Sequence, residues 1–239
     1  YTGTFTYLNP ISGQWETGQA FSAVDAGTYE VTFKLTGTGN YLGTDYTDTK
    51  TGEITKQTIP VDPTLVMDVT PYTETYDGTE KLVADANLKT GLTYEGSFYY
   101  SIYENGTWNG WIPGNERKAT DAGDSPTKCK FTASVNYEGE VISDPVTGKI
   151  NPKQVGPDPE PYLTTSAYSR VYNQGAQVVA EAAPANGISG DIYYKGQGET
   201  DWTKASQYLK TEVGTYPVSF KIVGTGNYTG EVEAPAVVG

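Results

Sequence analysis

The strongest constraint on the fold of this chain is a block of strand and turn that recurs three times. Residues 26–35, 122–131 and 213–222 align without a gap, and an Asn-Tyr-x-Gly turn follows each, at 40–43, 136–139 and 227–230. Further landmarks keep the same register, namely a glycine nine residues after each turn (Gly52, Gly148, Gly239) and a tryptophan twelve residues before each corner glycine (Trp15, Trp111, Trp202). The spacing predicts a tandem repeat of roughly 90–95 residues, the size of a small β-sandwich.

The register divides the chain into three units. Residues 58–153 make a complete unit, whereas 1–57 correspond only to the C-terminal part of one, because Tyr1 matches Tyr94. Residues 154–239 stop before the final strand that residues 148–151 supply in the second unit. Proline-rich linkers at 59–63 and 156–161 are expected to stiffen the joints. The missing strands would come from the same chain or from a neighbouring one.

Composition and periodicity predict an all-β fold. The chain has 20 Tyr and no helix-length apolar stripe, and tyrosine favours a pleated, half-buried surface. Residues 29–35 alternate, so Tyr29, Val31 and Phe33 face one way and the residues between them the other. In the second unit Cys129 stands where Phe33 stands in the first, which predicts a buried, unreactive thiol.

Charge and missing residue types exclude several functions. The net charge of −13 repels nucleic acid and anionic membranes, and no run of about 18 apolar residues predicts a membrane span. Without histidine and with one cysteine, the chain has no serine–histidine triad, no histidine zinc site and no internal disulfide. Its only aligned carboxylates, Asp25, Asp121 and Glu212, are expected to cap backbone N–H groups in the corner turn. We therefore expect no catalysis.

Calcium is the one cofactor that the sequence suggests. Asp45 and Asp48 lie together in the loop after the first Asn-Tyr turn, and the linkers add Asp62 and the pair Asp158 and Glu160. Carboxylate oxygens are the ligands that Ca²⁺ prefers, although no segment has the order of a known calcium loop. Ca²⁺ binding is therefore kept as a hypothesis.

The tryptophans are the candidate ligand-binding residues. Trp15, Trp111 and Trp202 each follow a turn-rich stretch, and Trp108 has no counterpart in the other units, so we expect Trp108 to be the more exposed. Their aromatic faces could stack on sugar rings. Fixed spacing favours a second interpretation, in which each indole packs within its own unit. One tyrosine of each pair 99–100 and 193–194 is expected to meet solvent.

Several of these motifs together resemble a known family. They are the Tyr76-Asp77-Gly78 opening, the tryptophan hairpin, the Asn-Tyr-x-Gly turn, and the strand at 25–29, which is similar to the tyrosine corner of immunoglobulin-like domains. The chain thus resembles the immunoglobulin-like, Tyr-Asp-Gly-type repeats of large bacterial surface proteins. The resemblance implies tandem immunoglobulin-like sandwiches, with β-grasp-like repeats as the alternative.

The resemblance also implies where the chain works and with what. It points to an extracellular array, secreted or on the bacterial cell surface, that acts as a non-catalytic spacer or supports adhesion. The alternative is a module that itself binds glycan or a host or bacterial surface protein through exposed aromatic residues. Neighbouring repeats and self-assembly are the other partners that the resemblance implies.

Overall fold

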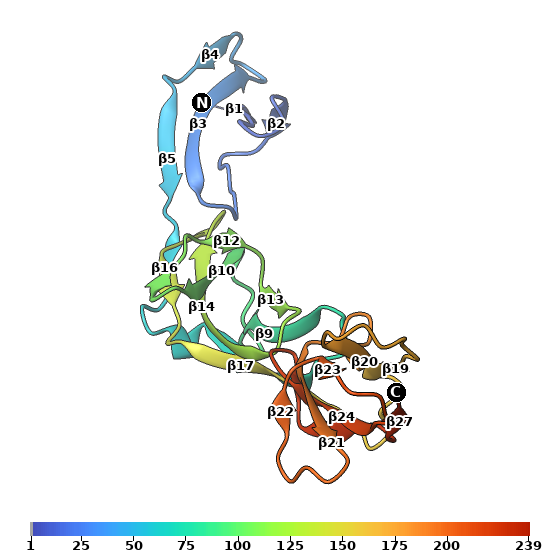
Figure 1. Ribbon diagram of the computed structural model, residues 1–239. Helices are drawn as coiled ribbons and strands as arrows, with labels where there is room; N and C mark the ends of the chain where they lie inside the picture. The colour runs from blue at the N-terminus through green and yellow to red at the C-terminus, as the bar shows by residue number, and fades with distance from the viewer. Residues whose placement is uncertain (1) are drawn as a thin grey trace.

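The computed structural model describes residues 2–239, and its sheets fall into three groups that follow one another along the chain (Figure 1). Within that range one short 3₁₀ turn, η1 (Pro63–Leu65), is the only helical element. It is far too short to cross a membrane, and no other segment of these residues forms a helix that could. Residue 1, where the sequence begins the first unit, lies outside the described range.

The first unit is a single sheet. Its order is β2-β1-β3-β4, with β5 also paired to β3. The strands are β1 (Gly3–Leu8), β2 (Trp15–Thr17), β3 (Gly27–Gly37), β4 (Thr44–Tyr46) and β5 (Lys50–Ile54). No second sheet packs on it within residues 2–239, so Val31 is its only buried hydrophobic residue among those described.

The second unit is a two-sheet sandwich. A three-stranded sheet has the order β13-β9-β7, and a seven-stranded sheet has the order β11-β10-β14-β17-β8, with β12 on β10 and β16 on β14. The strands are β7 (Met67–Pro71), β8 (Thr73–Thr75), β9 (Lys81–Leu88), β10 (Gly96–Glu104), β11 (Thr107–Trp108), β12 (Ile112–Pro113), β13 (Glu116–Ala119), β14 (Gly123–Ala133), β16 (Glu140–Ile142) and β17 (Val146–Asn151).

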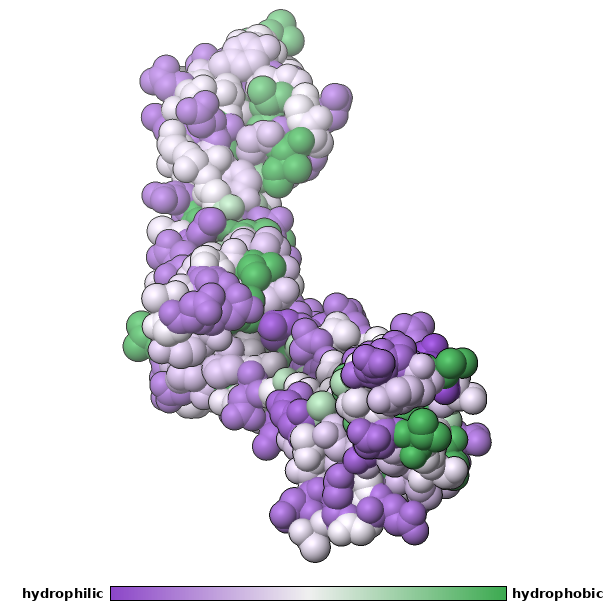
Figure 2. All heavy atoms as spheres, in the orientation of Figure 1, coloured by the Kyte–Doolittle hydropathy of each residue, from purple (hydrophilic) through white to green (hydrophobic). Residues whose placement is uncertain are grey.

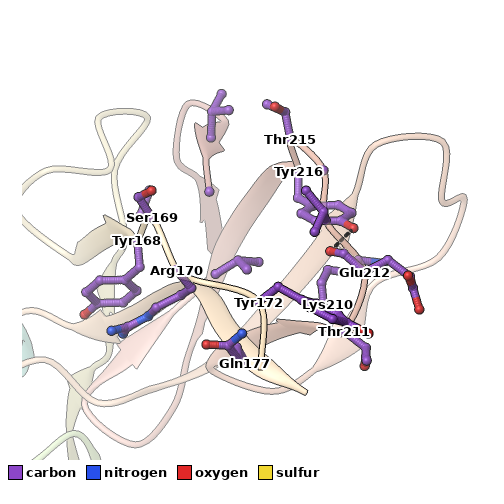
Figure 3. A pocket seen from close by; sticks show the side chains of 16 residues that line it. Tyr168, Ser169, Arg170, Tyr172, Gln177, Lys210, Thr211, Glu212, Thr215 and Tyr216 are labelled. Carbon is purple, nitrogen blue, oxygen red and sulfur yellow. Dashed lines mark hydrogen bonds between the residues drawn. The ribbon is translucent and has the colours of Figure 1, made fainter. Parts of the chain in front are cut away.

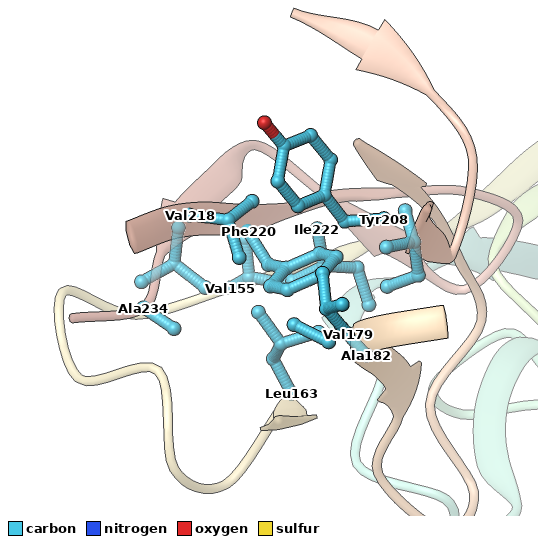
Figure 4. Packing of buried hydrophobic residues seen from close by; sticks show 12 residues of the cluster. Val155, Leu163, Val179, Ala182, Tyr208, Val218, Phe220, Ile222 and Ala234 are labelled. Carbon is cyan, nitrogen blue, oxygen red and sulfur yellow. The ribbon is translucent and has the colours of Figure 1, made fainter. Parts of the chain in front are cut away.

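The third unit repeats this arrangement. One sheet has the order β19-β20-β23, and the other β22-β21-β24-β26 with β27 on β24. The strands are β19 (Leu163–Ala167), β20 (Gln177–Pro184), β21 (Gly190–Gly196), β22 (Thr203–Lys204), β23 (Gln207–Lys210), β24 (Pro217–Gly224), β26 (Glu231–Glu233) and β27 (Val237–Val238). Phe220 and Ile222 of β24 are completely buried at the centre of its core, with Leu163 and Val179 facing them from the other sheet (Figure 4).

The strand order identifies the sandwiches as immunoglobulin-like. In the second unit β7, β9 and β13 share one sheet while β10, β14 and β17 share the other, and in the third unit β19, β20 and β23 are divided in the same way from β21, β24 and β27, which is the division of an immunoglobulin-type domain. The short strand β8 crosses to run parallel beside β17. The predicted all-β, immunoglobulin-like fold is thus confirmed, and the order is not a β-grasp-like one.

The tyrosine corner is present where the sequence keeps its tyrosine. The hydroxyl of Tyr29 donates to the carbonyl of Asp25 at 2.7 Å, and that of Tyr216 donates to the carbonyl of Glu212 at 2.7 Å. In the second unit Ser125 takes the corresponding place. There the inward-facing Thr127 and Cys129 are fully buried, so a smaller and more polar set of side chains fills the same strand.

Burial of Cys129 is confirmed. It is 1% exposed, and desolvation, followed by the charge of Asp85, raises its thiol pKa to about 11. A thiol with so high a pKa forms little thiolate at neutral pH. Cys129 therefore serves as a small core residue.

The glycines that follow the Asn-Tyr turns mark a close approach of the two sheets. A Cβ on Gly148 would overlap the carbonyl of Val83, and a Cβ on Gly239 would overlap that of Val179. At Gly52, by contrast, nothing lies within 4 Å of the same position, because no sheet faces β5. Glycine is required where the facing strand is present.

Candidate functional site

Two short linker strands join the units. β6 (Gln57–Thr58) pairs in parallel with β15 (Tyr137–Glu138), and β18 (Lys153–Gln154) pairs in parallel with β25 (Tyr228–Thr229). At the first joint the N–H groups of Gln57 and Ile59 donate to the carbonyls of Asn136 and Glu138, at 2.9 and 3.0 Å. At the second joint Lys153 and Val155 donate to Asn227 and Thr229, both at 2.9 Å. Each linker is therefore fixed on the unit that follows it.

An asparagine side chain fastens each unit to the preceding one. The Oδ1 atom of Asn136 accepts from the N–H of Ala26 at 2.6 Å, and its Nδ2 donates to the carboxylate of Asp25 at 3.0 Å. Asn227 makes the same pair of bonds with Ala122 and Asp121, at 2.6 and 2.9 Å. We call this arrangement the asparagine clamp.

The clamp corrects the expected role of two carboxylates. Asp25 and Asp121 were predicted to cap N–H groups of their own turn, but each accepts its hydrogen bond from the asparagine of the next unit. The donor asparagine lies more than one hundred residues away in sequence. Local turn patterns could not show a bond of that kind.

Apolar residues complete the joints. Ile59 and Val155 are buried in the core of the unit that follows them. At the second joint Tyr76 packs edge-on against Tyr228, with ring centroids 5.6 Å apart. The corresponding place at the first joint is a hollow of about 280 Å³ bordered by Ile54 and Tyr137.

This packing explains the Tyr-Asp-Gly motif. Tyr76 lies at the joint, while Asp77 accepts from the N–H of Thr79 at 2.9 Å and pairs with Lys81. The ammonium of Lys81 and the Thr79 bonds together hold the pKa of Asp77 below its usual range. Gly78 has a φ of 86°, which suits glycine in the turn. The motif therefore forms a turn at the end of the second unit to which Asn227 of the third unit binds.

A lysine lies over a tryptophan at the same place in each unit. The Nζ atoms of Lys34, Lys130 and Lys221 lie 4.5, 5.1 and 5.0 Å from the ring centroids of Trp15, Trp111 and Trp202 respectively. The contact is a cation–π interaction that covers one face of each indole. Trp15 and Trp111 are still 40% and 36% exposed, and Trp202 is half-buried. Each of these tryptophans therefore packs against a lysine of its own unit.

Trp108 is less exposed than the sequence suggests. It is half-buried, with Lys128 4.6 Å above its ring and Tyr103 5.2 Å away. The expectation that it is the more exposed tryptophan is wrong, since Trp111 is more open to solvent. The tight hairpin between β10 and β11 returns Trp108 opposite Tyr103, which covers it.

The tyrosine pairs divide between the faces of their strands. Tyr100 and Tyr194 pack against the cores, while Tyr99 and Tyr193 lie under Lys130 and Lys221 on the outer face. Each of these lysines also pairs with a glutamate, Lys130 with Glu140 at 3.5 Å and Lys221 with Glu231 at 2.8 Å. The second and third units thus share an outer face of tyrosine, lysine, tryptophan and glutamate.

The predicted calcium residues are exposed. Asp45, in β4, accepts from the N–H of Tyr46 at 2.9 Å, and Asp48 follows it in the loop. Asp62 accepts from the N–H and hydroxyl of Thr64 at the start of η1, and Asp158 accepts from the N–H of Glu160. Across residues 2–239 no group of three or more acidic, cysteine or histidine side chains lies close enough together to hold a metal ion.

Comparison with known proteins adds no family to these observations. The chain matches no protein-family model, and no curated protein matches it at a significant level. Among solved structures, the fibronectin(III)-like modules of Clostridium thermocellum CbhA match 70% of this chain and 92% of their own, with 16% identity and a TM-score of 0.24. The FN1–FN3 domains of chicken CNTN1 match 99% of this chain and 88% of theirs, with 10% identity and a TM-score of 0.27. Such values carry no argument, so the strand order is what identifies these units as immunoglobulin-like sandwiches.

Proposed function

We propose that the chain is a non-catalytic spacer, a tandem array of immunoglobulin-like units with fixed joints, that belongs to an extracellular bacterial surface protein. The observation that carries this proposal is the asparagine clamp, because both joints use it with matching distances. A flexible linker needs no such contacts. Two joints that are fixed by the same contacts are instead expected in a chain that keeps its outer units at a constant distance.

The chemistry of the joints supports a stiff connection. Each joint combines two backbone hydrogen bonds, two side-chain hydrogen bonds and one buried apolar anchor. Individual bonds of this kind contribute about 1 kcal/mol, and each joint adds several of them over a short linker. In this proposal the array projects or supports an adhesive module, and the absence of histidine fits a role without catalysis.

A distance measurement between the outer units tests the spacer function. Fluorophores on Ile11→Cys and Val171→Cys, both strongly exposed positions, would report the separation of the first and third units in a Cys129→Ser background. The expected result is one narrow distance distribution, which broadens in the double variant Asn136→Ala, Asn227→Ala. Asn40→Ala is the matched control, because Asn40 occupies the same turn in the first unit and is exposed. A broad distribution in the parent chain would contradict the proposal.

A second function rests on the exposed outer faces of Trp15 and Trp111. Both indoles stay exposed beside their lysines, at 40% and 36%, so the units could bind glycan or a surface protein there. A glycan array with the parent chain and with Trp111→Ala separates this function from the spacer. Binding that Trp111→Ala removes and Trp108→Ala retains would favour a binding module.

A further inference from the structure

The corner glycine of each unit occupies the same place, but an aromatic ring covers it in only two of the three units. A Cβ added to Gly27 would lie 3.7 Å from the Cζ atom of Tyr29, and one added to Gly214 would lie 2.9 Å from the Cζ atom of Tyr216. Figure 3 shows the ring of Tyr216 from close by, with the hydrogen bond of its hydroxyl dashed. At Gly123 of the second unit nothing lies within 4 Å of the same point. The second unit therefore lacks the ring that covers this glycine elsewhere.

A second aromatic side chain is also replaced at this corner. The residue six positions after each aligned tryptophan is Phe21 in the first unit and Tyr208 in the third, but it is Arg117 in the second. Phe21 packs against Tyr29, with ring centroids 5.4 Å apart. The same two positions of the second unit hold Arg117 and Ser125. An aromatic pair thus becomes an arginine and a serine.

These replacements are accompanied by a cavity of about 460 Å³ at the corner of the second unit. Arg117, Gly123 and Ser125 line it, and we call it the corner cavity. All its lining residues belong to the second unit, where β17 is in place beside Gly123. A cavity of about 150 Å³ is already large enough for benzene. One aromatic ring therefore fits in the space that the missing tyrosine leaves.

Two polar groups of the corner cavity are suited to a phenol. In the other units the tyrosine hydroxyl donates to the carbonyl of the residue four positions earlier. In the second unit that carbonyl belongs to Asp121, and no tyrosine is present to donate to it. The Nε atom of Arg117 is buried and has no hydrogen-bond partner within residues 2–239. A guanidinium is attracted to the face of an aromatic ring, so a ring that carries a hydroxyl would satisfy both groups.

The charge of the lining disfavours an anionic ligand. Four carboxylates outnumber two cations around the corner cavity, namely Glu80, Glu104, Asp121 and Asp124 against Arg117 and Lys118. They would repel a carboxylate or a phosphate, whereas an uncharged phenol is not repelled. Hydrophilic residues also predominate on the face of the second and third units that Figure 2 shows. A single ring therefore suits this corner better than a broad apolar partner surface.

From this comparison we propose that the corner cavity binds a phenolic ring, which is either a free para-substituted phenol or a tyrosine side chain of a partner. The ring lies over Gly123, where Tyr29 and Tyr216 place their own rings in the other units. Its hydroxyl donates to the carbonyl of Asp121, and Arg117 lies beside its face. This site is distinct from the exposed tryptophans, and it exists only in the unit that has lost its tyrosine corner.

Titration of the ¹⁵N-labelled full chain with p-cresol, which is the side chain of tyrosine, tests the proposal. p-Cresol is expected to shift the amide resonances of Gly123, Asp124 and Ser125. Toluene keeps the ring but lacks the hydroxyl, so it should bind about fivefold more weakly. Absence of shifts at these amides with millimolar p-cresol, or equal binding of toluene, would overturn the proposal.

N-acetyltyrosinamide distinguishes the two sources of the ring. It carries the same phenol on a peptide backbone. If it shifts the same amides as p-cresol, the site accepts a tyrosine side chain of a partner. If p-cresol binds and N-acetyltyrosinamide does not, the ligand is a free phenol, and the proposal holds in that form.

Variants at one position test where the ring lies. Ser125→Tyr restores the side chain that the other units carry, so it should fill the corner cavity and weaken p-cresol binding about tenfold or more. Ser125→Phe fills the same space and gives a second test if the tyrosine variant does not fold. Ser125→Ala leaves the space open and should bind like the parent, and equal binding by the filled and open variants would overturn the proposal. The spacer function rests on the joints, so failure here would leave its distance measurement unaffected.

Discussion

The side chain of Asn136 accepts a hydrogen bond from the N–H of Ala26 at 2.6 Å, across 110 residues of sequence. Asn227 repeats the bond with Ala122 at the same distance. In both cases the same amide also donates to the aspartate that precedes the alanine. One side chain thus ties a turn of one unit to a corner of the unit before it.

Asn136→Ala should loosen the first joint without unfolding either unit. The change removes two hydrogen bonds, one of them to a carboxylate, and at this half-exposed site we expect a loss of about 1–2 kcal/mol of joint stability. Hydrogen exchange at the amides of Ala26, Gln57 and Ile59 would measure the loss. Asn40→Ala should leave these amides unchanged, and unaltered exchange in Asn136→Ala would show that the clamp contributes nothing.

Gly148→Ala should destabilise the second unit strongly. The new methyl group would overlap the backbone of Val83, which cannot rotate away, so a cost of about 3 kcal/mol or more is expected. Hydrogen exchange along β14 would report it. The same change at Gly52, where nothing lies within 4 Å, is the control and should cost far less than 1 kcal/mol. Similar effects at both glycines would contradict the close approach of the sheets.

The thiol of Cys129 should react slowly in the native chain. Because Cys129 is buried, a thiol reagent should modify it roughly a thousandfold more slowly than in denaturant. Rapid labelling at neutral pH would show that the core of the second unit is open.

The raised pKa of Cys129 also predicts a pH dependence of stability. Burial raises the pKa from near 9 in the unfolded chain to about 11, so the folded state holds the proton more tightly. The resulting stabilisation is complete below about pH 9 and is lost as pH rises through about 11. It amounts to at most about 3 kcal/mol. Urea unfolding of the parent and of Cys129→Ala across this pH range isolates the effect of the thiol from tyrosine ionisation, which both chains share. Parallel profiles of the free energy of unfolding against pH would refute the prediction.

Lys128 and Trp108 should show energetic coupling. The ammonium lies 4.6 Å from the ring centroid, and such contacts contribute about 0.5–1 kcal/mol at partly exposed sites. A double-mutant cycle with Lys128→Met and Trp108→Leu, followed by urea unfolding of the second unit, would measure it. Lys118→Met, which affects only an exposed ion pair with Glu116, is the control. Zero coupling would mean that Trp108 does not pack with Lys128.

Local pattern was enough to predict much of the fold. Alternation in residues 29–35 predicted the inward-facing side of β3, and alignment with Phe33 predicted that Cys129 is buried, because side chains alternate along any strand. The Asp25–Tyr29 segment predicted the tyrosine corner, since that bond spans four residues. The boundaries of the three units and the ligand-binding role of the tryptophans stay predictions.

The sequence by itself determined strands, their faces and the recurring register, since these depend on neighbours a few residues apart. Only the tertiary structure decided what the recurring residues do. The glycine at 148 faces the backbone of Val83, Lys130 lies over Trp111, and Asp25 accepts its bond from Asn136 rather than from its own turn. Each of these contacts joins segments that are distant in the chain, and the energy of such a contact depends on separation in space. The asparagine clamp is visible in the sequence only as a turn that recurs, and its partner appears once the units are placed side by side.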